Sequence, residues 1–297
     1  MPKKEKIAAN VVTYNRKDLL RECLNSLLAQ TRKPDSIIIV DNNSNDGTKE
    51  MLEKEFLDNP IFDYVRLNEN TGSAGGQYTG IKRAYEKGFD WVWCMDDDAI
   101  PKRNCLEKMV SKSKKEKNYF IFLPKKVDVF GQIQKKHIGN FSKHFLNIES
   151  LMEAERLADF GSFVGPLFSR KVIKQVGFPN KNLFIWSDDT EYFLRIRNFG
   201  FRSVAVNNAV IIHKDDAGKR MVNNFNWKNY YGWRNKIYIR KKYCEPFWYF
   251  LFLISFFARE LATIFLVYRK PKYVKVLMRS FMDGSKGNLG FKGLSFD

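Results

Sequence analysis

The chain has 297 residues, of which 44% are hydrophobic and 28% are charged. This composition is typical of a globular protein and excludes a disordered or fibrous chain. The length suits one large α/β domain with an additional segment. The formal net charge is +18, and more than half of the positive excess follows His213. The C-terminal end is therefore expected to face an anionic surface.

The four cysteines are scattered along the chain, with no Cys-x-x-Cys pair and no histidine at ligand spacing. We therefore expect neither a disulfide framework nor a zinc site, but reduced thiols in a cytosolic protein. The N-terminal Met-Pro-Lys-Lys-Glu-Lys leads into a strand-like segment rather than into the apolar core of a signal peptide.

The first hundred residues alternate between short apolar runs and amphipathic segments. The runs predict buried strands over 7–13, 36–40, 62–67 and 89–95, and the apolar spacing predicts helices over 19–28, 49–56 and 74–86. Apolar strands that alternate with helices are typical of a parallel sheet covered on both faces. Ligands bind such sheets at the carboxyl ends of the strands, so the residues that follow each strand are the candidates for a site.

The remainder of the chain is less regular. Residues 101–165 have no clear period, 182–199 contain a predicted helix with an acidic start, and short strands are expected from there to His213. From Asn224 onward the sequence is aromatic and basic and predicts apolar helices. We therefore expect a main domain over 1–223 and a helical region over 224–297.

Three consecutive carboxylates, Asp96, Asp97 and Asp98, follow the last of the early strands. Like charges at this spacing repel one another, so a stable fold is expected to place them beside a cation or in water. Oxygen ligands at a strand end suit Mg²⁺ or Mn²⁺ that holds a diphosphate. An acidic surface turn explains the same residues, and the spacing alone does not decide between the two interpretations.

Two polar loops follow other strands of the predicted sheet. Asp41 ends a strand and begins a turn rich in Asn, Ser and Gly, so it either caps that turn or accepts hydrogen bonds from a nucleobase. The segment from Asn70 to Gly76 precedes a helix, and its glycines would let backbone amides approach a phosphate or a sugar. It matches neither the dinucleotide-binding spacing nor the P-loop lysine pattern.

A second acidic pair, Asp188 and Asp189, lies at the start of the predicted later helix. Acidic residues are favourable at a helix N-terminus, and the functional alternative is a general base. Trp186 either stacks on a sugar or fills the core. His213 ends an apolar run, where a lone histidine is more often a polar strand end than a metal ligand.

Together these segments resemble the family 2 glycosyltransferases with a GT-A fold. The resemblance rests on Val12-Thr13-Tyr14-Asn15-Arg16, Val40-Asp41-Asn42-x-Ser44-x-Asp46-Gly47-Thr48, Asn70-x-Gly72-x-x-Gly75-Gly76, Asp96-Asp97-Asp98 and Trp186-x-Asp188-Asp189. Tyr230-Tyr231-x-x-Arg234-Asn235 and Asp283-Gly284-x-Lys286-Gly287-x-Leu289-Gly290 resemble the rhamnosyltransferase and galactofuranosyltransferase branch. The implied fold is a mixed, mainly parallel α/β sheet flanked by helices, with a C-terminal helical membrane-associating region.

The resemblance also implies roles for individual residues. Nucleotide-sugar binding is implied for Thr13, Asn15, Arg16, Asp41, Asn70, Gly75, Asp96 and Asp97. Asp96, Asp98 and His213 would bind Mn²⁺ or Mg²⁺, Asp189 with its neighbour Asp188 would supply the catalytic base, and Trp186 would hold the acceptor. Residues 1–100 would then form the nucleotide-sugar-binding half of a catalytic domain, and 101–223 its acceptor and metal half.

The implied reaction transfers a sugar, with inversion, from a nucleotide-sugar to a hydroxyl of a glycan or lipid-linked glycan in the synthesis of a surface polysaccharide such as O-antigen or capsule. UDP-galactofuranose and dTDP-rhamnose are both compatible donors. The acceptor-loop tryptophans of polymerising galactofuranosyltransferases are not evident near 160–163, so addition of one or a few sugars is expected. The alternatives are a nucleotidyltransferase and a basic nucleic-acid-binding protein, although no nucleic-acid-binding module is recognisable.

The apolar run 247–268 is long enough to span a membrane, which takes about 20 residues. Arg259 and Glu260 lie near its middle, where a charge costs roughly 2.5–3.5 kcal/mol. A helix that lies in the interface avoids this cost by turning both charges to water, and basic residues flank the run. We expect it to hold the protein on the cytoplasmic face of an anionic membrane. A buried helix, covered by the catalytic domain or by a second copy in a homo-oligomer, is the alternative.

Overall fold

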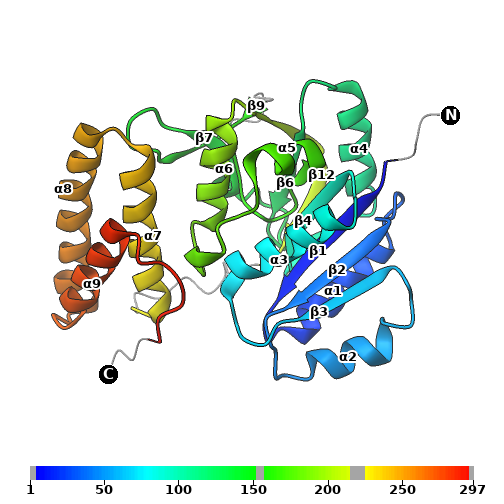
Figure 1. Ribbon diagram of the computed structural model, residues 1–297, viewed down its shortest axis with the longest axis horizontal. Helices are drawn as coiled ribbons and strands as arrows, with labels where there is room; N and C mark the ends of the chain where they lie inside the picture. Colours follow the sequence, from blue (N-terminus) through cyan, green and yellow to red (C-terminus); the bar gives the residue numbers. More distant parts are fainter. Residues whose placement is uncertain (1–4, 152–156, 215–224, 294–297) are drawn as a thin grey trace.

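The computed structural model describes residues 5–151, 157–214 and 225–293. A nine-stranded mixed sheet forms its centre (Figure 1). Its strands lie in the order β3 (Phe62–Arg66), β2 (Ser36–Asp41), β1 (Ile7–Thr13), β4 (Trp91–Asp96), β11 (Leu167–Ser169), β6 (Ile121–Val127), β12 (Ser203–His213) and β5 (Ala99–Pro101), and β9 (Leu157–Ala158) pairs with β12. Strands β3, β2, β1 and β4 are mutually parallel, as are β6 and β12. The short β11 joins the two groups and runs antiparallel to both.

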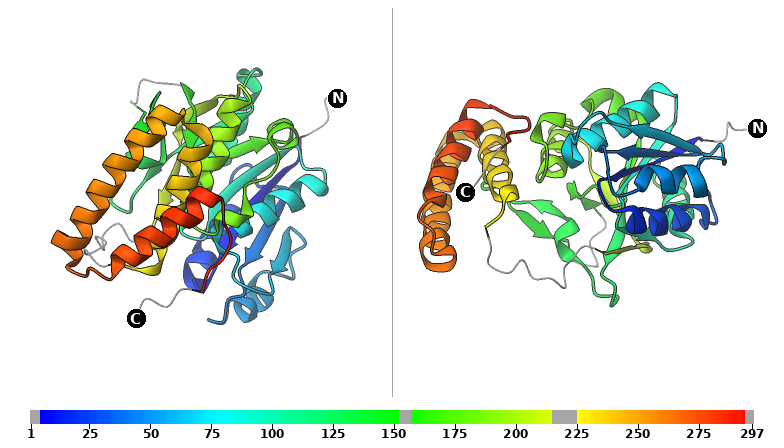
Figure 2. Two further views of the ribbon diagram at one scale, coloured as in Figure 1. Left: turned by 60° about the vertical axis from the view of Figure 1, so that its left-hand side comes forward. Right: turned by 90° about the horizontal axis from the view of Figure 1, so that it is seen from below.

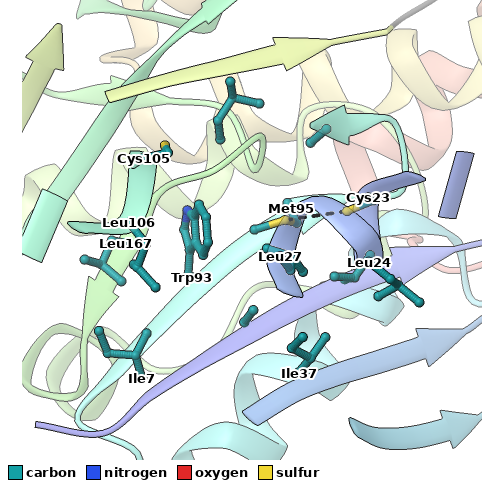
Figure 3. Packing of buried hydrophobic residues seen from close by; sticks show 14 of the residues in the cluster. Ile7, Cys23, Leu24, Leu27, Ile37, Trp93, Met95, Cys105, Leu106 and Leu167 are labelled. Atoms are coloured by element: carbon teal, nitrogen blue, oxygen red, sulfur yellow. Dashed lines mark hydrogen bonds between the residues drawn. The ribbon is translucent and has the colours of Figure 1, made fainter. Parts of the chain in front are cut away.

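Helices cover both faces of the sheet. On one face, α1 (Lys17–Leu28), α2 (Thr48–Glu55) and α4 (Cys105–Lys115) contribute to a buried cluster with alternate residues of β1 and β4. Figure 3 shows Leu24 and Leu27 of α1 in this cluster, together with Trp93 and Met95 of β4. On the other face, α3 (Gly72–Glu86), α5 (Arg170–Val176) and α6 (Asp188–Asn198) form a second cluster. The two-sided burial explains why these strands are apolar at successive positions.

The predicted fold class is confirmed, and the early elements lie within two residues of their predicted bounds. The helix with an acidic start that was predicted within 182–199 is confirmed as α6, which begins at Asp188 after a 3₁₀ turn, η2 (Lys181–Leu183). One expectation for the later chain needs correction. The short strands expected before His213 are one strand of 11 residues, β12, whose pairing with β6 shifts register between Val206 and Val210.

The aperiodic middle of the chain contributes α4 and β6 to the main fold, and its later part forms a small accessory sheet. Strands β10 (Phe160–Gly161), β7 (Ile138–Phe141) and β8 (Ile148–Ser150) pair antiparallel, and the 3₁₀ turn η1 (Lys135–His137) precedes β7. Elements this short give little periodic signal, which is why the sequence pattern did not predict them.

The C-terminal residues form a separate helical unit, composed of α7 (Trp227–Tyr243), α8 (Pro246–Ala262), the π-helical η3 (Thr263–Tyr268) and α9 (Tyr273–Lys286). It has a hydrophobic core of its own, which includes Trp233, Phe256 and Leu277. Figures 1 and 2 show α7 on the side of the central sheet and α8 on the outside. The predicted boundary at 223/224 lies outside the described residues.

The continuous helix Pro246–Tyr268 has the length and mean hydropathy, 2.0, of a membrane-crossing segment, and only 22% of its most apolar window is buried. The chain itself therefore covers little of this helix. The expectation that both charges turn to water is wrong for one of them: the Arg259 side chain is 63% exposed, whereas the Glu260 side chain is only 12% exposed and pairs with Arg259 at 2.8 Å.

Candidate active site

The carboxyl ends of three adjacent strands bring together residues that lie far apart in the sequence. In the sheet, Thr13 of β1 lies opposite Asp41 of β2, and Val12 lies opposite Asp96 of β4. Asp97 and Asp98 follow in the turn between β4 and β5, where both are buried. The Thr13 hydroxyl donates to Asp97 Oδ2 at 2.8 Å. Polar groups are therefore gathered at the edge of the sheet where ligands of parallel sheets bind.

Arg16 supplies the positive charge that this acidic turn requires. Its Nη1 atom contacts Asp97 Oδ1 at 3.0 Å and Asp98 Oδ2 at 2.7 Å. Burial raises the pKa of Asp97 to about 6, although Arg16 opposes the shift. Burial also raises the pKa of Asp98, but His213 and Arg16 outweigh it and lower that pKa to about 2. Asp98 is therefore the carboxylate of this turn that stays ionised most readily.

His213 reaches Asp98 from the end of β12, because β12 pairs with β5 and aligns His213 with Ala99. The His213 Nε2 atom lies 3.3 Å from Asp98 Oδ1. On the other side of the ring, Nδ1 lies 2.8 Å from Gln134 Oε1, and Gln134 Nε2 donates to the His213 carbonyl at 3.2 Å. Because the amide oxygen accepts, Nδ1 carries the proton, and Nε2 is the ring atom directed at the carboxylate.

These groups suit a divalent cation in part. Asp98 Oδ1 is buried and makes no hydrogen bond, and a carboxylate beside an imidazole is a donor set that Mn²⁺ accepts. Asp96 lines the same pocket as His213, but one of its oxygens accepts from Gln77 Nε2 at 3.3 Å. Within the described residues, no three His, Cys, Asp or Glu side chains are gathered as one metal site. Among the residues that the structure describes, Asp98 and His213 are thus two donor groups that converge, and a complete coordination shell would need further donors.

A pocket of about 380 Å³ connects this edge with the start of α6. Its lining includes Asp96, His213, Trp186, Asp188, Asp189 and Lys236. The second acidic pair and the predicted acceptor tryptophan therefore face the same space as a predicted metal ligand. Sequence analysis missed Lys236, because a lysine in a basic helix carries no signal of its own.

The two carboxylates at the start of α6 differ in their surroundings. Asp188 is buried, and its Oδ2 accepts from the Ser73 hydroxyl at 3.0 Å. Asp189 is half-buried, and its Oδ1 accepts from the Thr190 backbone amide at 2.6 Å. Burial raises the pKa of both, and the neighbouring charge of Asp189 helps to raise the pKa of Asp188 to about 7. Asp189 is the better placed of the two to meet a ligand in the pocket.

The loop that precedes α6, residues 182–187, has an unusual backbone. Phe184, Trp186 and Ser187 have φ values of 66°, 64° and 64°. Side chains other than glycine enter this left-handed region at a cost of about 1–3 kcal/mol each. Such strain persists only where neighbouring groups hold the backbone, and it is concentrated in functional loops.

The remaining predicted nucleotide-binding residues form the other side of the strand edge. The two oxygens of Asp41 accept from the Ser44 amide at 2.8 Å and from the Tyr64 hydroxyl at 2.9 Å. Asn15 Oδ1 accepts from the Asn45 amide at 2.8 Å, which joins two of the predicted loops. The structure therefore gives Asp41 and Asn15 local partners that shape this edge.

Asn70 and Gly75 also have local roles. Asn70 Oδ1 accepts from the Gly72 amide at 2.8 Å. A Cβ atom at Gly75 would lie 2.2 Å from the Thr71 hydroxyl oxygen, so glycine is required there for packing against the loop. The glycine loop is in this respect a tight helix start, as well as a candidate surface for a sugar or phosphate.

The comparisons with known proteins agree with this architecture. The family described as Glycosyl transferase family 2 matches residues 10–177. Galactofuranosyltransferase GlfT1 of Mycolicibacterium smegmatis is 36% identical over 97 residues, which cover 33% of this chain and 31% of that protein. dTDP-rhamnosyl transferase RfbF of Shigella flexneri is 27% identical and covers 96% of this chain and 97% of its own length. The chain is thus matched over only about a third of GlfT1, but over nearly all of RfbF.

Solved structures show the same fold. The mannosyltransferase PcManGT from Pyrobaculum calidifontis, in complex with GDP-Man and Mn²⁺, superposes with a TM-score of 0.58 at 17% identity and covers 81% of this chain and 64% of that one. The sheet, its helices and the polar strand edge define a GT-A glycosyltransferase. The chain belongs to glycosyltransferase family 2.

The raised pKa values of Asp188 and Asp189 predict that the acid limb of the pH–activity profile lies at a higher pH than for an ordinary aspartate. A general base works only when deprotonated, so activity should fall as the pH falls through a pKa above the ordinary aspartate value of about 3.9. We expect kcat/KM for nucleoside diphosphate release to fall on acidification at a pH above the ordinary aspartate range, because burial raises the pKa of Asp189. The stability of the protein is monitored in parallel. In Asp188→Asn the limb should move to lower pH, because one charge of the interacting pair is removed. An acid limb near pH 4 in the wild-type protein would contradict this assignment.

Proposed function

We propose that this chain is an inverting, metal-dependent glycosyltransferase that adds one or a few sugars to a hydroxyl of a glycan or lipid-linked glycan in surface polysaccharide synthesis. UDP-galactofuranose and dTDP-rhamnose are the favoured donors, in line with the similarity to GlfT1 and RfbF. The observation that supports the proposal is the shared pocket, which is lined by Asp189 and Trp186 together with Asp96 and His213. Residues assigned to the donor side and residues assigned to the acceptor side thus line one cavity.

The proposed chemistry assigns roles to the residues at and near this pocket. Asp189 takes a proton from the acceptor hydroxyl, whose oxygen attacks the anomeric carbon from the face opposite the leaving group. The bond between that carbon and the diphosphate oxygen breaks in the same displacement, so the configuration at this carbon is inverted. Trp186 offers a flat apolar surface for a sugar ring. Thr13, Arg16 and Asp97 form the supporting network on the donor side.

A divalent ion fits the Asp98–His213 pair. Asp98 and His213 would hold it, with Asp96 in the same pocket as His213, and the bound ion would neutralise charge on the departing diphosphate. Gln134 fixes the orientation of the His213 ring, so it would act on the ion through His213. The structure of PcManGT, which contains Mn²⁺, supports the choice of this metal, and the support rests on similarity of fold alone.

Replacement of the proposed base should abolish transfer and spare donor binding. Asp189→Asn keeps the shape of the side chain and loses its basicity, so kcat should fall by about 10²–10⁴-fold. The dissociation constant for the nucleotide, measured by calorimetry with Mn²⁺, should stay within about twofold. Asp188→Asn is the matched control. If that variant is inactive and Asp189→Asn is active, the base is Asp188.

Replacement of the proposed metal ligand should raise the metal requirement. His213→Ala removes an imidazole from the ligand pair and should weaken Mn²⁺ binding by about 10–100-fold. Direct titration of Mn²⁺ into the protein, followed by calorimetry, gives a readout without turnover. His144→Ala is the control, because His144 stacks on Trp248 of the C-terminal unit at 4.0 Å. Equal Mn²⁺ affinity in the two variants would show that His213 is structural.

We also propose that α8 and η3 attach the protein to the cytoplasmic face of an anionic membrane. Phe250, Ile254 and Leu266 are large apolar residues on the outside of this helix, and contiguous exposed apolar surface is typical of membrane or protein contacts. Basic clusters flank the helix, at 240–242 and 269–272. Each basic residue near an anionic leaflet contributes about 1 kcal/mol. A lipid-linked acceptor would then arrive at the same surface.

Flotation with liposomes that contain phosphatidylglycerol tests this attachment. The double variant Phe250→Asp/Ile254→Asp should lose most of its flotation, because both carboxylates would enter the apolar part of the interface. Phe199→Asp is the control, since Phe199 is comparably exposed but lies just after α6 in the main domain. Equal flotation of the double variant and the control would exclude α8 as the attachment site.

A donor panel tests the proposed reaction itself. The protein is mixed with Mn²⁺, a membrane glycolipid extract and individual nucleotide-sugars, and nucleoside diphosphate release is measured. UDP-galactofuranose or dTDP-rhamnose should give the largest release. In a separate reaction with a nucleoside triphosphate and a sugar 1-phosphate, production of pyrophosphate would identify a nucleotidyltransferase. Retention on DNA at physiological salt would favour nucleic-acid binding.

A further inference from the structure

The loop 182–187 belongs to the catalytic domain, and its backbone is hydrogen-bonded to the C-terminal helical unit. We propose that Arg234 and Asn235 of α7 are positioning residues, which hold this loop in its strained conformation and thereby place Trp186 and Asp189 in the pocket. The helical unit is then part of the acceptor side of the site, in addition to its proposed membrane contact. The expected effect on catalysis rests on the proposed function, whereas the expected effect on the loop conformation does not.

Asn235 binds the loop backbone at three points. Its Nδ2 atom donates to the carbonyl oxygens of Leu183 at 3.0 Å, Ile185 at 3.0 Å and Trp186 at 2.8 Å. The side chain is fully buried, so water does not compete for these hydrogen bonds. The Asn235 amide group, which has two hydrogens, thus binds the carbonyls of the residues before and after Phe184 and of the residue before Ser187. Both Phe184 and Ser187 have left-handed backbone conformations.

Arg234 fixes both Asn235 and a second segment. Its Nε atom donates to Asn235 Oδ1 at 3.0 Å, which orients the Asn235 amide nitrogen toward the loop. Its Nη2 atom donates to Leu183 O at 2.9 Å, and its Nη1 atom donates to Gly290 O at 2.7 Å. The Gly290 amide in turn donates to Asn182 O at 2.6 Å. A buried guanidinium therefore joins the loop, α7 and the segment after α9.

The opposite side of the loop contacts the nucleotide half. The Ala74 amide of α3 donates to Phe184 O at 3.1 Å. A Cβ atom at Gly72 would lie 2.0 Å from the same oxygen, so the helix start and the loop are in close contact. Ser73 holds Asp188 from the same helix turn. The loop is thus held between α3 and α7, and loss of the α7 contacts would release one of its two sides.

Gly232 of α7 adds a steric contact to these hydrogen bonds. A Cβ atom at this position would lie 2.7 Å from Cε3 of the Trp186 ring. The ring therefore packs directly on the α7 backbone. The same helix holds the carbonyl of Trp186 through Asn235 and limits where its side chain can lie.

The test uses Asn235→Leu in the full chain, which keeps the volume and removes the donor. We expect kcat to fall by about 10–100-fold and KM for the acceptor to rise, because a displacement of about 1 Å at a catalytic group has effects of this size. Nucleotide affinity should change by less than about twofold. Hydrogen exchange of the peptide that covers 182–192 should accelerate at least tenfold, while exchange in β1 and β4 stays unchanged.

Ile237→Ala is the matched control. Ile237 is a buried residue of the same helix, and it packs against Gly284 of α9 rather than against the loop. This variant should lower the melting temperature as much as Asn235→Leu or more, yet keep kcat and loop exchange at wild-type values. If both variants lose activity in proportion to stability, or if neither changes loop exchange, Arg234 and Asn235 have a general structural role and the proposal is overturned.

Gly232→Ala gives an independent variant that needs no buried polar group to be removed. The added methyl should displace the Trp186 ring and raise acceptor KM with a smaller effect on nucleotide affinity. Wild-type acceptor KM in this variant would contradict the placement of Trp186 by α7. If no nucleotide-sugar supports turnover of the wild-type protein, the proposed function fails, and the hydrogen-exchange comparison still decides whether Asn235 holds the loop.

Discussion

Three carboxylates, Asp96, Asp188 and Asp189, line one pocket, and Asp97 and Asp98 follow Asp96 directly in the chain. The mutual repulsion of these five groups is the constraint on which the rest of the site depends. Asp96, Asp97 and Asp98 come from the end of β4, and Asp188 and Asp189 come from the start of α6. Burial of like charges is unfavourable unless cations or donors compensate it. Arg16, Thr13, Ser73 and Gln77 provide part of this compensation. The concentration of carboxylates at this site supports the proposal that it binds a cation and removes a proton.

The strand edge that we propose for nucleotide binding was largely predictable from the sequence. Each early strand is an apolar run, and a polar residue follows it at the carboxyl end. Because parallel strands end at one edge, the position of Asp41 and Asp96 follows from the strand order alone. The pairing of β12 with β5, which brings His213 to Asp98, could not be predicted, because short antiparallel strands leave no periodic pattern. Gln134 was missed for the same reason.

The acceptor side depends on contacts that no local pattern encodes. The left-handed residues Phe184, Trp186 and Ser187 are not glycines, so the sequence gives no sign of their backbone conformation. Their conformation is held by Asn235, about 50 residues later in the chain. The Tyr230–Asn235 segment was recognised as a family resemblance, but only the structure assigns it a physical task. The exposed apolar face of α8 lies on the far side of the same helical unit (Figure 2).

In the proposed reaction, Asp189 activates an acceptor hydroxyl for a single displacement at the anomeric carbon. The most direct measurement is the anomeric configuration of the newly formed linkage, determined by NMR on product made from a donor of known configuration. A single displacement predicts that the linkage has the opposite configuration to the donor sugar. Retention of the donor configuration would contradict the account, because it requires a second displacement or a different attacking group.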